Sequence, residues 1–530
     1  MIKKYFWIWL GVIVLIGGLL RMIGLDKNPP HIGNDEISIA FDSFSLRTTG
    51  KDGYGIKWPL SFKSHRDYKA PLYAYLNMPF NWIFGNNEYG VRFLSAFVGT
   101  LGILMIGLMG KFFKNEKLGL MSATLLALNP KAVFASRMAY EANLAMILVS
   151  LGIYVLFLFR KNQKQWYLII SGLFLGFSIW AYHTQKGLVP LVLVLMPWLL
   201  RKEIKLRKWF LLWITTCLVI LPIFLDFINV SRKDPFNRAS SQIWFQQASI
   251  QDYLKSSNDN LFKKIVKVSA DPVYRYFDYL SLDFSFGKGM DLFPKNEPFN
   301  FGWFLVFTAP LLFVGLFNMR LIFGKYLNWF LTWWLLCPIV PSLTWGEPAS
   351  VRNLAFIIPT ILIMAGGLLV IFDKNKKIFT VLTIGILINF GYFGIAYYNH
   401  FPKISGDNYQ YGYKQAWEYI KPIESKYEKI IMESRFGNTG QYSGLPELYF
   451  GYFGAFEAKD MQEKDYNLNK IKKYWTRDID WNKELVEKNS LYVVSISNPK
   501  AGDNFDKLEL LTTIYKPDGE PQFLIYKTIN

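Results

Sequence analysis

The chain has 530 residues, of which 52% are hydrophobic and 18% aromatic, and its formal net charge is +19. Soluble domains do not carry this share of apolar and aromatic side chains over such a length, so the composition excludes an ordinary soluble enzyme and indicates a polytopic membrane protein. Basic loops that face anionic lipid account for the positive charge, and no basic stripe indicates a nucleic-acid partner.

The first apolar run covers residues 5–22 and follows Lys3 and Lys4. Its length, with no small-residue cleavage site after it, favours a retained span over a signal peptide. Ten further runs of roughly spanning length follow: residues 91–110, 118–135, 142–159, 166–182, 187–200, 209–229, 301–317, 326–343, 352–372 and 378–397. The sequence therefore predicts about eleven transmembrane helices, and ten to twelve is the range that fits, because one run is short and contains two prolines.

Basic residues recur in alternate connections between these runs, near residues 111–117, 160–164, 201–208, 320–325 and 374–377. The positive-inside rule places such loops in the cytoplasm together with the N-terminus. We therefore predict a multi-pass protein of the cell membrane, in contact with membrane lipids. The large segments on the outer side are then residues 24–90, 230–300 and 398–530.

The last segment changes in composition and predicts an extracytoplasmic α/β domain over residues 398–530, after a transmembrane domain over residues 1–397. Its expected elements are a helix at residues 413–420 and strands at residues 429–433, 491–497, 508–515 and 522–528, the last two joined by a turn at residues 517–520. The chain has two cysteines, Cys217 and Cys337, on different predicted spans. We therefore expect no disulfide in the outer domain.

Charged residues gather at the predicted outer ends of the helices, on one face of the membrane. They are Asp35, Glu36, Lys69, Arg92, Arg137, Glu141, His183, Lys186 and Arg352. Charges at a membrane boundary are functional candidates because each needs a partner. A carboxylate beside several cations can take a proton from an acceptor hydroxyl while Lys and Arg neutralise a phosphate leaving group. A sugar linked to polyprenyl phosphate fits that arrangement, since its tail stays in the bilayer.

Each of these residues also has a structural explanation. Asp35 and Glu36 are placed to cap a helix over residues 37–46. Lys69 can extend to the lipid headgroups, and Arg92 and Arg352 can serve as interfacial anchors. The remaining charges have similar alternatives, which are an i,i+4 salt bridge between Arg137 and Glu141 and a plain interfacial position for His183 and Lys186.

The same stretches carry a family resemblance. They are Asn34-Asp35-Glu36, residues 49–55, Lys69 to Tyr73, Val91 to Ala96 and Ser136 to Glu141, with Arg352 to Pro359 matching more loosely. Residues 1–200 resemble the bacterial relatives of protein O-mannosyltransferases and the aminoarabinose lipid A transferases. These are GT-C fold glycosyltransferases of the family 39 type.

The resemblance implies an α-helical GT-C membrane enzyme in which Asp35 activates the acceptor and Glu36 completes the acidic motif. It implies that Lys69 and Arg92 hold the donor phosphate and that Glu141 is a second acid near the acceptor or sugar, where some relatives carry Asp. We count Arg137, Lys186 and Arg352 as further phosphate-binding candidates. Direct attack by the activated hydroxyl predicts inversion at the anomeric carbon.

No cofactor is required for this chemistry, and the four histidines are too scattered to predict a metal site, although a divalent ion is compatible with the sequence. The acceptor presents a hydroxyl, on a protein, a lipid or a polysaccharide, and we expect residues 230–300 to cover the donor. One alternative is a transporter or flippase of lipid-linked sugars, which would hold its charges near the bilayer midplane. Another is a non-catalytic scaffold, which leaves Asp35, Lys69 and Arg92 unexplained.

Overall fold

The computed structural model describes residues 2–63, 68–229, 243–289, 301–344, 349–437, 444–481, 484–498 and 505–529. The chain forms two compact units. The first contains Met1–Ile23, Leu60–Tyr73 and Ser95–Gly394, and the second contains Gly24–Pro59, Ala74–Leu94 and Ile395–Asn530. The predicted domain boundary at residue 398 stays a prediction.

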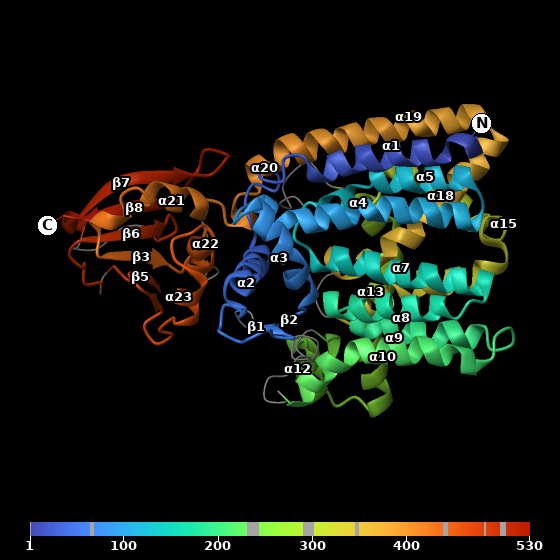
Figure 1. Ribbon diagram of the computed structural model, residues 1–530, viewed down its shortest axis with the longest axis horizontal. Coiled ribbons are helices and arrows are strands. Elements are labelled where there is room, and N and C mark those ends of the chain that lie inside the picture. Colours follow the sequence, from blue (N-terminus) through green and yellow to red (C-terminus); the bar gives the residue numbers. More distant parts are fainter. Residues whose placement is uncertain are drawn as a thin grey trace. The chain divides into compact units, whose positions relative to one another are not determined.

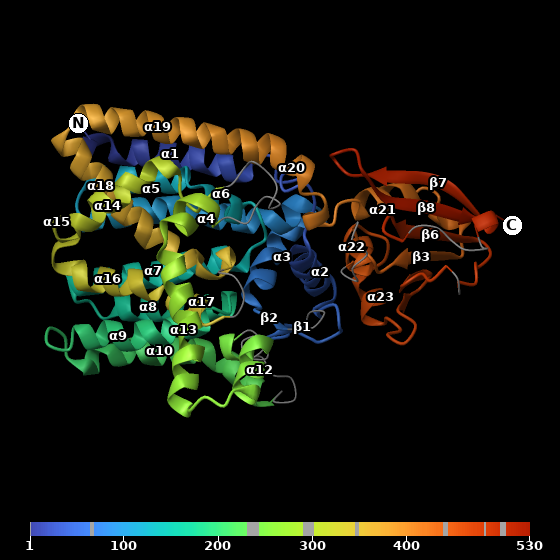
Figure 2. The same cartoon turned by 180° about the vertical axis from the view of Figure 1, so that it is seen from behind.

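The first unit is a bundle of helices (Figures 1 and 2). Its longer helices are α1 (Ile2–Met22), α4 (Glu88–Phe113, from Ser95 on), α5 (Glu116–Ala127), α7 (Glu141–Asn162), α8 (Trp166–Ala181), α9 (Gln185–Leu199), α10 (Leu206–Asn229), α18 (Ile357–Lys374) and α19 (Lys376–Ile395). Shorter helices are α6 (Pro130–Ser136), α14 (Ala309–Phe317), α15 (Met319–Phe323), α16 (Leu327–Leu336) and α17 (Ile339–Ser342), with 3-10 turns η3 (Val306–Thr308), η4 (Gly324–Tyr326) and η5 (Ser350–Phe356). Helix α8 packs between α7 and α10, and α18 packs against α5 and α14.

Glycines set the close approach of α14 and α18. A Cβ atom on Gly367 would lie 2.1 Å from the carbonyl oxygen of Leu311, and one on Gly315 would lie 2.1 Å from that of Ile363. Small residues at a helix contact are typical of membrane bundles, where packing replaces the hydrophobic driving force. Helix α18 is buried from Ile357 to Val370.

Six helices of the described residues are long and apolar enough to cross a membrane, and up to eight if each of two bent pairs is one span. The bent pairs are Glu116–Ala127 with Pro130–Ser136, and Val306–Phe317 with Met319–Ser342. Helices α8 and α9 coincide with predicted runs but are shorter than the six. The predicted α-helical membrane fold is confirmed, whereas the number of about eleven spans stays a prediction.

The predicted outer segment at residues 230–300 is helical where it is described. It contains η1 (Trp244–Gln246), α12 (Ala248–Ser256), α13 (Leu261–Leu280) and a π-helical turn, η2 (Asp283–Lys288). Residues 230–242 and 290–300 lie outside the described ranges. The expected covering of the donor by this segment stays a prediction.

The second unit combines two helices from the N-terminal part of the chain with a sheet domain. These helices are α2 (Asn34–Thr49) and the part of α3 (Leu72–Phe84) that follows Tyr73. The sheet has the order β4-β5-β3-β6-β8-β7, and its strands are β3 (Lys429–Glu433), β4 (Lys470–Ile471), β5 (Tyr474–Arg477), β6 (Ser490–Ser495), β7 (Leu508–Tyr515) and β8 (Pro521–Thr528). Strands β5, β3 and β6 are parallel, and the other neighbours are antiparallel.

Helices α20 (Phe401–Ile404), α21 (Tyr413–Ile420), α22 (Pro446–Tyr452) and α23 (Ala458–Gln462) complete this unit (Figure 1). A buried cluster that includes Ile431, Ile479, Tyr492 and Val494 forms a core of the sheet. The predicted α/β class of the C-terminal segment is confirmed, because the expected helix and strands appear within one or two residues of their predicted limits.

Candidate active site

The acidic motif forms the first turn of α2. Gly33 is the N-cap residue, and its backbone N–H donates to Glu36 Oε2 at 3.0 Å. A carboxylate in this position satisfies a free N–H group and interacts favourably with the helix dipole. The capping explanation therefore holds for Glu36, whose side chain is buried.

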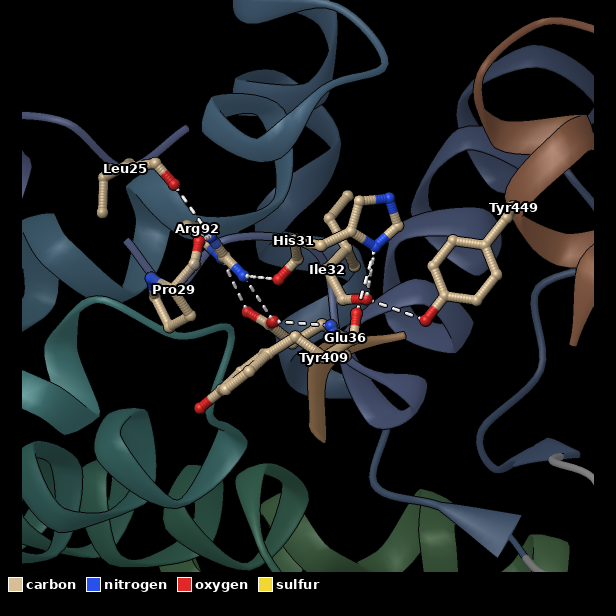
Figure 3. Close-up of polar contacts among 9 residues, drawn as sticks. Leu25, Pro29, His31, Ile32, Glu36, Arg92, Tyr409 and Tyr449 are labelled. Atoms are coloured by element: carbon tan, nitrogen blue, oxygen red, sulfur yellow. Dashed lines mark hydrogen bonds and ion pairs between the residues drawn. The ribbon is translucent and has the colours of Figure 1, made fainter. Parts of the chain in front are cut away.

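Arg92, from the first turns of α4, lies against Glu36 (Figure 3). Its Nε donates to Glu36 Oε1 at 3.0 Å and one terminal nitrogen donates to Oε2 at 2.8 Å, which makes a bidentate pair. The remaining N–H groups donate to the carbonyl oxygens of Leu25, Pro29 and His31. An arginine has five N–H donors, and here all of them are used within the protein. These contacts favour a positioning role for Arg92, and phosphate binding by this residue stays a prediction.

His31 is buried beside this pair and is neutral. Its Nδ1 lies 3.2 Å from the carbonyl oxygen of Ile32 and 3.1 Å from that of Tyr409, so Nδ1 carries the proton. Burial lowers the pKa of His31 to about 4. The Tyr449 hydroxyl donates to the same Ile32 carbonyl at 2.7 Å (Figure 3). Thus residues from the C-terminal segment fix the loop that precedes α2.

Asp35 differs from its neighbour Glu36 in exposure and in contacts. Its side chain is exposed, and within the described ranges it has no hydrogen bond or ion pair. The next residue, Glu36, is held by Gly33 and Arg92, so the backbone that carries Asp35 is fixed while its carboxylate stays accessible. This combination suits a general base that must reach an incoming hydroxyl.

In the first unit, Lys69 and Lys186 line one small cavity together with His183. The cavity has a volume of about 10 Å³, which is room for about one water, and Leu60, Ser61, Tyr68, Ala70, Pro71, Ile179 and Ile223 complete its wall. Lys69 is placed there by a two-stranded ribbon, β1 (Phe62–Lys63) and β2 (Tyr68–Lys69), and Lys186 by the first turn of α9. Lys69, His183 and Lys186 thus line one space, and basic side chains of this kind are suited to an anion.

The other predicted site residues of the first unit lie in different surroundings. Arg137 is buried and donates to the carbonyl oxygens of Leu20 and Ile23, at 3.1 and 2.7 Å, so it binds the backbone at the end of α1. Glu141 begins α7 and is partly exposed. Arg352 lies in η5 and donates to Thr344 Oγ1 at 2.7 Å. Their roles toward substrate stay predictions.

The structure thus brings together Glu36 with Arg92, and Lys69 with Lys186. The sequence missed the contribution of His31, Tyr409 and Tyr449, because contacts between residues about four hundred positions apart leave no local pattern. The described residues contain no group of three or more His, Cys, Asp or Glu side chains that could hold a metal ion.

Comparison with known proteins shows what the chain is similar to. Residues 68–226 match the family model of dolichyl-phosphate-mannose-protein mannosyltransferases, and no curated protein sequence matches the chain. Two crystal structures of ArnT from Cupriavidus metallidurans are similar, both with a TM-score of 0.56. The form bound to undecaprenyl phosphate is 13% identical and covers 98% of both chains. The apo form is 12% identical and covers 98% of this chain and 97% of its own.

The archaeal oligosaccharyltransferase AglB from Archaeoglobus fulgidus is similar at 14% identity, with a TM-score of 0.48, over 82% of this chain and 63% of its own. Part of the chain therefore matches a glycosyltransferase family model, and nearly the whole chain has the GT-C fold of the ArnT structures, a multi-pass membrane fold. The resemblance to this class that the sequence predicted is confirmed. The matched segment, residues 68–226, includes Lys69, Arg137, Glu141 and Lys186.

Proposed function

We propose that this protein moves a sugar from a polyprenyl-phosphate donor to an acceptor hydroxyl on the outer face of the membrane. The observation that carries the proposal is the pair Lys69 and Lys186 around one cavity, within the segment that matches the mannosyltransferase family model. Cations that converge beside a membrane bundle are suited to a lipid phosphate. The ArnT structure bound to undecaprenyl phosphate supports this choice of donor by analogy of fold.

In the proposed reaction Asp35 accepts the proton of the acceptor hydroxyl, and the oxygen of that hydroxyl attacks the anomeric carbon of the donor sugar. The bond between that carbon and the phosphate oxygen breaks, and the polyprenyl phosphate leaves with the bonding electron pair. Lys69 and Lys186 neutralise the charge that develops on the phosphate. One displacement without a covalent intermediate inverts the anomeric centre.

Glu36 and Arg92 have a different part in this proposal. Their buried bidentate pair holds the first turn of α2 and the loop over residues 25–31, and so it keeps the Asp35 backbone in one place. A base that is positioned in advance reacts faster than one that must be ordered in the transition state. Glu36 and Arg92 are therefore positioning residues.

The proposal is tested by sugar transfer in membranes that contain the full chain, with a panel of radiolabelled polyprenyl-phosphate sugars. Lipid extract and protein lysate serve as acceptors. Asp35→Asn should lower the turnover rate about 10²- to 10⁴-fold, the usual contribution of a general base, with donor binding retained. Asp26→Asn changes an exposed carboxylate of the same outer loop and should leave transfer unchanged.

Lys69→Gln should instead weaken donor binding. Full activity of Asp35→Asn would remove the assignment of the base. If no donor is consumed while lipid-linked sugar crosses the bilayer, the protein is a transporter and the transferase proposal is wrong.

A further inference from the structure

Helix α3 exposes an apolar face and buries a polar one. Its exposed positions are Leu76, Pro79, Trp82 and Ile83, and Trp82 and Ile83 are 72% and 61% exposed. These positions recur every three or four residues, so they form one stripe of the helix. A helix that faced water would carry polar side chains there, and the stripe therefore indicates contact with a less polar medium.

The orientation of α3 is fixed by amides on its buried face. Asn77 Nδ2 donates to the carbonyl oxygen of Gly90 at 3.0 Å. Asn81 Oδ1 accepts a bond from Arg47 Nε at 2.9 Å, and Asn81 Nδ2 donates to the Tyr452 hydroxyl at 3.2 Å. Rotation of the helix to hide its apolar stripe would break these bonds, so the exposure of the stripe is built into the fold.

Beside this stripe lies a groove of about 440 Å³, a volume within the usual range of ligand sites. It is lined by Leu46, Arg47, Gly50, Trp58, Met78, Pro79 and Trp82. Trp58 is 51% exposed, and its ring stacks on that of Tyr75 with the ring centroids 6.2 Å apart. Trp58 has a positive φ of 44°, which is unusual for a bulky residue and indicates that its neighbours hold it in place.

Three exposed cations border the groove. Arg47 lines it directly, while Lys51 and Lys57 are the chain neighbours of the lining residues Gly50 and Trp58 and lie opposite each other in a backbone bridge. Within the described ranges none of the three has a carboxylate partner. Like charges held together without a counter-ion attract an anion. These three cations also lie in a predicted outer segment, and the positive-inside rule accounts only for basic residues in cytoplasmic loops.

We propose that this groove binds an anionic phospholipid, with an acyl chain against Trp58, Met78 and Trp82 and the headgroup phosphate beside Arg47, Lys51 and Lys57. The apolar stripe of α3 then lies in the interfacial layer of the membrane. Trp and Arg side chains are suited to that layer because each combines an apolar body with a polar end. A carbohydrate fits this groove less well, because Arg47 is the one charged or amide side chain among its lining residues.

This inference does not depend on the sugar-transfer proposal and is tested without an activity assay. The full chain is solubilised and titrated with phosphatidylglycerol or phosphatidylcholine of the same acyl chains, and bound lipid is counted by native mass spectrometry. We expect phosphatidylglycerol to bind more tightly than phosphatidylcholine. The variant Arg47→Gln/Lys51→Gln/Lys57→Gln should lose about a hundredfold in affinity for phosphatidylglycerol at low ionic strength.

Two further variants separate charge from fold. Lys51→Gln/Lys57→Gln leaves the bond between Arg47 and Asn81 intact and should still lower the affinity more than tenfold. A charge-matched control, Lys421→Gln/Lys426→Gln/Lys488→Gln, removes three other exposed lysines of the same unit. It should leave the affinity for phosphatidylglycerol unchanged.

Trp82→Ser removes an apolar wall of the groove and should lower the affinity for both lipids by the same factor. Equal binding of the two lipids by the wild type, or an unchanged affinity in the triple variant, would overturn the proposal. Displacement of phosphatidylglycerol by millimolar inorganic phosphate would identify a simple phosphate site instead.

Discussion

At the scale of single residues, Arg92 can either position α2 through Glu36 or bind the donor phosphate, and the two roles predict different results for the same variant. If Arg92 positions α2, Arg92→Gln leaves the Glu36 carboxylate buried without its cation and should destabilise the fold by about 3 to 5 kcal/mol. Thermal unfolding of the detergent-solubilised protein measures this. The double variant Arg92→Gln/Glu36→Gln should recover part of the loss, because the uncompensated charge is gone.

A phosphate-binding role gives the opposite result. Arg92→Gln would then unfold at the wild-type temperature and raise KM for the lipid-linked donor. Of the two terminal nitrogens that would contact a phosphate, one donates to the carbonyl oxygens of Leu25 and Pro29, and the other donates to Glu36 and to the carbonyl oxygen of His31. We therefore expect the loss of stability.

The sequence identified the charged residues around the first turn of α2, but not the residues that contact them. The sequence indicates Asp35, Glu36 and Arg92 because a charge at the end of a span needs a partner, and that argument uses only position along the chain. It could not distinguish an exposed Asp35 from a buried Glu36, since adjacent residues of a helix point in different directions. Nor could it find His31 or Tyr449, because their contacts join segments that are distant in sequence.

At the scale of elements, periodic patterns predicted the limits of a strand and a helix, whereas apolar length indicated helices without their bends. Strand β7 has the limits that its alternation predicted, and α21 coincides with its amphipathic run. Residues 301–343 were predicted as two spans and form two helical segments bent by 73° against each other, so their number of membrane crossings stays a prediction. Hydropathy indicates whether a segment can lie in lipid, but it does not predict where a helix bends.

The contact of α14 with α18 gives a prediction at this scale. Gly367→Ala places a methyl group where the Leu311 carbonyl oxygen lies, so the helices must separate and stability should fall by about 1 to 3 kcal/mol. Gly391→Ala in α19 meets no atom within 4 Å and is the matched control, which should unfold at or above the wild-type temperature. Equal unfolding temperatures for the two variants would show that this contact does not limit stability.

At the scale of the whole molecule, the predicted cytoplasmic loops meet at one end of the helical unit. Lys111 lies 4.4 Å from the ring centre of Phe6 near the start of the chain. Two ion pairs then join other basic loops, Arg160 to Glu203 at 3.0 Å and Lys117 to Asp373 at 3.5 Å. Loops that the positive-inside rule assigned to one compartment are therefore neighbours in the folded unit.

This agreement allows a direct test of orientation. In a background of Cys217→Ser and Cys337→Ser, single cysteines are placed at Lys202, in the loop between α9 and α10, and at Lys426 in the C-terminal segment; both side chains are exposed. A membrane-impermeant maleimide should label the cysteine at 426 in intact cells and the cysteine at 202 only after permeabilisation. The reverse pattern would place Asp35 and the cavity of Lys69 and Lys186 on the cytoplasmic side, where a donor and acceptor of the outer leaflet could not reach them.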